Sequence, residues 1–123
     1  MQHPLRTVIV GAAGYTGAEL AWLLAAHPAC EIVGVFGSDK RAAEGEPPLS
    51  RLFPRLRGVV DLPVRVSSVQ AIVDLRPNVV FLCTPHEVSA AMAEALLAAE
   101  LVVIDLSAAF RLQNAADYPA HYG

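Results

Sequence analysis

The sequence has only two cysteines, and it lacks both long apolar runs and blocks of positive charge. Cys30 and Cys83 lie far apart and neither belongs to a C-x-x-C pair, which argues against a disulfide framework. Cysteines used in this way are typical of a reducing compartment, so we expect a cytoplasmic protein. The four histidines are too scattered for the ligand spacing of zinc, and we expect no metal site.

Two further absences narrow the range of partners. No apolar stretch approaches the roughly 20 residues that a membrane-spanning helix needs, so we expect no membrane contact. The net charge is −3 and Lys and Arg form no run, which argues against nucleic acid as a partner. The chain does contain 54% hydrophobic residues against 17% charged ones. That is enough apolar material for the core of one domain.

Short apolar runs alternate with helix-forming segments along the chain. The β-branched and apolar runs predict strands at residues 5–10, 31–36, 64–66, 78–83 and 101–105. Helical spacing predicts helices at residues 15–27, 68–75 (opened by a serine cap) and 86–100, with a helical turn near Leu52 in the proline-rich connection 37–63. Because such crossovers are right-handed, we expect a doubly wound α/β fold with a parallel sheet in the order 3-2-1-4-5.

Three glycines stand between the first predicted strand and the first predicted helix. Gly11, Gly14 and Gly17 follow each other at three-residue spacing, and Ala12 occupies the position of the first glycine in the pattern G-x-G-x-x-G. Such glycines either turn the chain or let its backbone approach a pyrophosphate at the start of the helix. The strand–helix alternation that follows favours the phosphate interpretation over a simple turn.

Residues after the second predicted strand bear on the choice of cofactor. Asp39 would accept the 2′-hydroxyl of NAD, although it lies later than the usual acidic position. Ser38 and Arg41 would instead hold the 2′-phosphate of NADP by hydrogen bond and charge. A solvated cluster of loop charges is the third interpretation.

Two motifs follow the fourth and fifth predicted strands, at the edge where such folds bind ligands. In "LCTPHEVS", Cys83 is interpreted as a small buried hydrophobe, because no base or oxyanion donor accompanies it. His86 either begins the helix for structural reasons or lies beside a cofactor. In "IDLSAAFRL", Arg111 either binds a phosphate or carboxylate, or pins its loop by a salt bridge to Asp105 or Asp117.

Five stretches occur in order and cover nearly the whole chain: "GAAGYTGAEL", "RLRGVVDLP", "VVFLCTPHEVS", "VVIDLSAAFRL" and "YPAHYG". Together they resemble N-acetyl-gamma-glutamyl-phosphate reductase, a relative of aspartate-semialdehyde dehydrogenase. The resemblance implies a Rossmann-type NADP-binding domain over residues 1–123 of a cytoplasmic, homo-oligomeric enzyme of arginine biosynthesis. It also implies an acyl-phosphate substrate, which such enzymes reduce to a semialdehyde with NADPH.

The resemblance also assigns roles to individual residues. The glycine turn would face the pyrophosphate, "CTPH" would border the nicotinamide ribose, and Arg111 would bind substrate. The cofactor-binding residues that it implies are Gly11, Ala13, Gly14, Tyr15, Thr16, Gly17, Ser38, Arg41, Cys83, Thr84, Pro85, His86 and Ser107. The family's nucleophilic cysteine lies in a glycine–cysteine–tyrosine–proline type motif downstream of "HYG", so we expect a chain truncated before its substrate domain, with no catalytic residue.

Two other functions stay open. Another acyl-phosphate or semialdehyde dehydrogenase would share the fold and the chemistry, but it should lack "HEVS". A free-standing NADP-binding sensor module would need no catalytic partner at all. The coding region past Gly123 distinguishes them, because only an enzyme needs an in-frame cysteine motif there.

We expect the purified chain of 123 residues to show no phosphate-dependent oxidation of the semialdehyde with NADP. The physical reason is that neither cysteine matches the family's nucleophile, so no thioester intermediate forms. The measurement is the absorbance of NADPH over time. Turnover that disappears in Cys83→Ser would contradict both the expected truncation and the packing role of Cys83.

Overall fold

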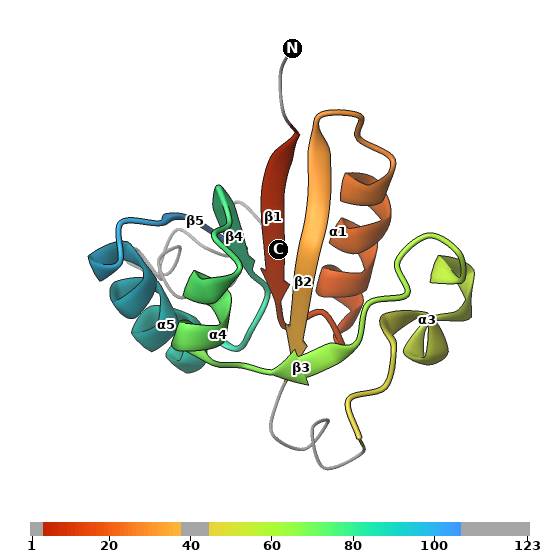
Figure 1. Cartoon of the computed structure of the whole chain (residues 1–123). Coiled ribbons are helices and arrows are strands. Elements are labelled where there is room, and N and C mark those ends of the chain that lie inside the picture. The colour runs from red at the N-terminus through yellow and green to blue at the C-terminus, as the bar shows by residue number, and fades with distance from the viewer. Residues whose placement is uncertain (1–3, 38–44, 107–123) are drawn as a thin grey trace, which may run out of the picture.

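Five strands form one parallel sheet in the structure, a computed structural model that describes residues 4–37 and 45–106 (Figure 1). The central strand β1 (Leu5–Val10) pairs with β2 (Cys30–Gly37) on one side and with β4 (Val79–Leu82) on the other. The edges are β3 (Val64–Val66) and β5 (Val102–Asp105). The order is β3-β2-β1-β4-β5, which confirms the predicted topology.

Helices connect the strands and cover both faces of the sheet. They are α1 (Tyr15–Ala25), the short α3 (Leu49–Leu52) with a 3₁₀ turn at Pro54–Leu56, α4 (Val69–Asp74) and α5 (His86–Ala98). All predicted elements are present, with ends displaced by one or two residues, as expected where terminal backbone groups change partners. The predicted serine cap is confirmed, because the Ser68 hydroxyl accepts from the Ala71 amide at 3.2 Å. Within the described ranges, no helix is long and apolar enough to cross a bilayer.

The core has two layers, one on each face of the sheet. Val8 and Val10 of β1 pack with Ile72 of α4 and Leu96 of α5. Ile9 points to the other face and packs with the buried residues of α1. In Figure 1, α1 accordingly lies on one side of the sheet, and α4 with α5 on the other. This alternation follows from the period of two along a strand.

We predict that Leu96→Ala destabilises the fold much more than Leu97→Ala, its neighbour on α5. Leu96 is fully buried, whereas Leu97 is 58% exposed. The first substitution removes apolar contacts and leaves a cavity, which costs about 2–5 kcal/mol, and the second should stay within about 0.5 kcal/mol. Urea unfolding followed by circular dichroism measures both. Equal losses would show that α5 is not docked on the sheet as described.

Candidate functional site

The turn after β1 depends on Gly11. Its φ of +87° lies in the left-handed region, which side chains disfavour. A Cβ at this position would also lie 2.6 Å from the carbonyl oxygen of Cys83. The amides of Gly11 and Ala12 both donate to the carbonyl of Phe36, at 2.8 and 3.0 Å. Gly11 therefore lets the chain turn where the ends of β1, β2 and β4 come together.

Gly17 has a packing role in the first turn of α1. It is buried, and a Cβ there would lie 2.3 Å from the carbonyl oxygen of Gly11 and 2.7 Å from the Cα of Ala12. The absent side chain thus lets α1 pack directly on the turn that precedes it, which is the helix–strand role of the third glycine in dinucleotide motifs.

Gly14 differs from the other two because it is exposed. A Cβ there would meet only the Gly11 carbonyl, at an ordinary 3.6 Å. Gly14 is the N-cap of α1, where no side chain caps the helix and no acidic residue lies in the first turn. The amides of a first helical turn lack intrahelical partners, and their dipoles make this end positive. The start of α1 is therefore suited to an anion that reaches it over Gly14.

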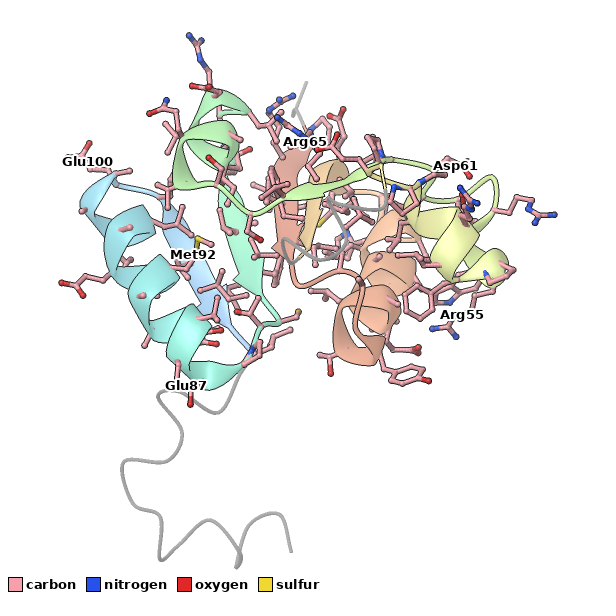
Figure 2. The ribbon with its side chains drawn as sticks, turned by 90° about the horizontal axis from the view of Figure 1, so that it is seen from below. Arg55, Asp61, Arg65, Glu87, Met92 and Glu100 are labelled. Atoms are coloured by element: carbon pink, nitrogen blue, oxygen red, sulfur yellow. The ribbon has the colours of Figure 1, made fainter. Side chains whose placement is uncertain are left out.

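A cavity of about 470 Å³ lies beside this turn, at the carboxyl edge of the sheet. Its volume falls within the range of small-molecule sites. Figure 2, seen from below Figure 1, looks toward this edge, with Glu87 marking the start of α5 and Glu100 lying beyond its end. The cavity-lining residues are Gly11, Ala13, Gly14, Gly37, Ser67, Cys83, Thr84, Pro85 and Val88. We expected the glycine turn to meet residues 84–86 and 106–111 at this edge, and this is confirmed for Thr84 and Pro85. Of residues 106–111, only Leu106 lies in the part of the chain that the structure describes.

Residues 6–121 match the family model described as semialdehyde dehydrogenase, NAD binding domain. The chain belongs to this family. Its glycine turn and strand-edge cavity are consequently those of a nucleotide-binding domain of semialdehyde dehydrogenase type.

Curated relatives of this semialdehyde dehydrogenase domain carry a more specific name. The chain is 48% identical over 121 residues to N-acetyl-gamma-glutamyl-phosphate reductase from Yersinia pseudotuberculosis, and 43% identical over 119 residues to the protein of that name from Escherichia coli. Each match covers 97% of this chain and 35% of the relative. The chain thus spans about a third of the length of these relatives.

A solved structure extends the comparison to the fold. Aspartate semialdehyde dehydrogenase with NADP from Candida albicans superposes with a TM-score of 0.71 at 20% sequence identity, covering 89% of this chain and 31% of that chain. At this identity the likeness shows the fold, a Rossmann-like domain with a parallel sheet, in agreement with the expected fold class.

The structure brings together six of the residues that the sequence assigned to the cofactor. Of the assigned residues, those that line the 470 Å³ cavity are Gly11, Ala13, Gly14, Cys83, Thr84 and Pro85. Thr16 lies outside it and lines a separate hollow with Leu23 and Leu106. Tyr15 borders that hollow too, and it also lines another one together with Ala13 and Gly14. Tyr15 is 90% exposed, and its ring lies edge-on to Phe53 with the ring centroids 6.3 Å apart.

Other assigned residues lie outside the described part of the chain. These are Ser38, Arg41, Ser107 and Arg111, together with Asp39, the alternative ribose ligand. His86 is the first residue of α5, so the prediction that it begins this helix is confirmed for its backbone.

Three residues that line the cavity were not predicted. Gly37 ends β2, Ser67 follows β3, and Val88 lies in the first turn of α5. The Ser67 hydroxyl donates to the Gly37 carbonyl at 2.7 Å, which joins these two strand ends. The rule that ligands bind at the carboxyl ends of parallel strands was the signal that would have identified Gly37 and Ser67.

The Cys83 thiol is protonated at neutral pH. Burial, with a further contribution from the charge of Asp105, raises its pKa to about 11. A protonated thiol is a poor nucleophile, which agrees with the packing role assigned to Cys83. The residue lies one position after β4 instead of ending it, because β4 ends at Leu82; its amide still donates to Val10 at 2.8 Å.

No metal centre is apparent in residues 4–37 and 45–106. No group of three histidine, cysteine, aspartate or glutamate side chains in these ranges is arranged to hold an ion.

We predict opposite outcomes for two glycine-to-alanine substitutions in this turn. Gly17→Ala should destabilise the domain by about 1–3 kcal/mol, because its methyl would overlap the Gly11 carbonyl. Gly14→Ala should change stability by less than about 1 kcal/mol, since its φ of −90° suits alanine and the space is open. Thermal unfolding of both variants tests this. A larger loss at Gly14 would contradict the packing described.

Proposed function

We propose that the chain is the NADP-binding domain of an N-acetyl-gamma-glutamyl-phosphate reductase, with its dinucleotide in the 470 Å³ cavity. The observation that carries this proposal is that one continuous cavity runs along the carboxyl edge of the sheet. A single cavity connects the uncapped start of α1, at Gly14, with Gly37 at the end of β2 and Cys83 just after β4. A dinucleotide needs such a path, because its pyrophosphate lies between two nucleoside halves that must spread along the sheet edge.

In this proposal the pyrophosphate lies at Gly14. Glycine there leaves the helix start open, so phosphate oxygens approach the first-turn amides without meeting a side chain. Glu19, the nearest acidic residue of α1 along the chain, ion-pairs with Arg55. That pairing partly neutralises its charge, which favours an anion at the helix start.

The positions of the two halves of the cofactor follow from the strand order. In this fold the adenosine ribose is bound at the end of β2, so we place the adenosine half near Gly37 and Ser67. Ser38 and Arg41 would then bind the 2′-phosphate of NADP, and Asp39 would bind the ribose of NAD if that were the cofactor. The remaining half extends toward β4, where Cys83, Thr84 and Pro85 line the cavity.

In the whole enzyme, the bound cofactor would supply the hydride that reduces an acyl phosphate to a semialdehyde. The described residues would bind and orient it. Neither described cysteine suits the role of nucleophile: Cys83 has its raised pKa, and Cys30 begins β2, at the opposite edge of the sheet. We therefore assign the chemistry of the acyl group to the whole protein. We also propose that the whole protein is a homo-oligomer in the cytoplasm.

An identity of 43–48% over nearly the whole chain favours this reductase over an aspartate-semialdehyde dehydrogenase. The solved structures named as aspartate-semialdehyde dehydrogenases are 19–28% identical to the chain. Dinucleotide binding with no role in catalysis would favour a sensor module instead.

We predict that the chain binds NADP about tenfold or more tightly than NAD. A charge-assisted hydrogen bond contributes about 1.5–3 kcal/mol, and only NADP carries a 2′-phosphate for Arg41. Arg41→Ala should therefore weaken NADP and leave NAD nearly unchanged. Isothermal titration calorimetry of both cofactors measures this, with Asp39→Ala as the matched variant. Tighter NAD binding that is lost in Asp39→Ala would assign the ribose to Asp39.

A further inference from the structure

Two hydroxyl groups meet behind the β4 end of the cavity. Ser89 lies on α5 and is fully buried, and Thr84 lies in the loop between β4 and α5 and lines the cavity. Their oxygens Oγ and Oγ1 are 2.5 Å apart. The Ser89 hydroxyl also lies 3.1 Å from the Thr84 carbonyl oxygen, to which it donates. Ser89 therefore contacts both the side-chain hydroxyl and the backbone carbonyl of Thr84.

The number of protons determines the direction of these hydrogen bonds. A serine hydroxyl carries one proton, and a carbonyl oxygen only accepts. If the Ser89 proton goes to the Thr84 carbonyl, the short contact between the hydroxyls takes the proton of Thr84. The Thr84 oxygen then keeps only lone pairs for any further partner.

The methyl group of Thr84 has its own contact. A Cβ at Gly11 would lie 3.1 Å from Thr84 Cγ2, so this methyl faces the glycine turn. With the hydroxyl held by Ser89 and the methyl against Gly11, the rotamer of Thr84 is set from two sides.

We propose that Ser89 is a positioning residue that makes Thr84 an acceptor-only group in the cavity wall, so that this end selects the hydroxyl-bearing sugar of the ligand and disfavours phosphate. A ribose hydroxyl donates to a lone pair, whereas a phosphate oxygen brings another lone pair and is repelled. The opposite end, at Gly14, offers amide donors and favours phosphate. The cavity thus has a donor end and an acceptor end, which orient a dinucleotide. This inference rests on the proposed dinucleotide function.

The experiment compares two ligands of the 123-residue chain by calorimetry. NADP carries the second ribose toward Thr84, whereas adenosine 2′,5′-bisphosphate ends before it. Thr84→Val keeps the shape and removes the oxygen, and Ser89→Ala removes the acceptor for the Thr84 proton. Each substitution should weaken NADP binding about three- to tenfold, which is the effect of one neutral hydrogen bond. Each should leave the affinity for the bisphosphate unchanged.

Two further variants separate positioning from damage to the fold. Thr84→Ser keeps the hydroxyl and should bind NADP nearly as the wild type does. Thr7→Val removes another fully buried hydroxyl that donates to a carbonyl, that of Glu31 at 3.0 Å in the sheet, and should change neither affinity.

The outcomes distinguish this inference from the proposed function. Suppose that the wild type binds both ligands and that Ser89→Ala and Thr84→Val bind NADP with the affinity of the wild type. This result overturns the positioning role and leaves the proposed function standing. Equal weakening of both ligands in these variants also overturns it, because it would reflect a structural loss. If the wild type binds neither ligand, the proposed function and this inference are overturned together.

Discussion

The close approach of the Gly11 backbone to the Cys83 carbonyl is the constraint on which the rest of the site depends. A side chain at Gly11 would overlap that carbonyl, so the end of β1 reaches the end of β4 only because the side chain is absent. The Phe36 carbonyl holds the end of β2 against the same turn, because it accepts hydrogen bonds from two of the turn's amides. Gly17 then brings α1 onto the Gly11 carbonyl. Three strands and one helix start are thereby joined around one short turn.

The departure from the usual glycine spacing has a structural reason. The left-handed residue is Gly11, one position before the place where G-x-G-x-x-G would put its first glycine. Ala12 occupies that place, and it is fully buried in the core cluster on the α1 face of the sheet. A small side chain is useful there, since it packs against α1 while its amide bonds to Phe36. Of the three glycines, Gly11 and Gly17 serve packing, and Gly14 alone leaves the helix start open.

The chemistry of the cavity wall differs from one end to the other. At α1 the wall offers backbone amides and a positive helix end. At β4 it offers a protonated thiol on Cys83 and a hydroxyl on Thr84 that Ser89 holds from behind. In the proposed function, a wall of this kind would bind and orient a polar ligand, and its described residues would supply no nucleophile. The domain is therefore suited to hold a cofactor for chemistry that other residues perform.

The sequence by itself determined the alternation of strands and helices, the sheet order and the position of the glycine turn, because periodicity, β-branching and glycine act over a few neighbouring residues. It also identified Thr84 and Pro85 as lying in the segment after the fourth strand. Only the tertiary structure decided that Gly37 and Ser67 share their cavity, because this depends on the pairing of β2 with β3 across a long connection. It likewise decided that Thr16, although two residues from Gly14, lines a different hollow. A sequence motif specifies neighbours along the chain, whereas a helix turns successive side chains to different sides, and the packing of α1 determines which of them line the cavity.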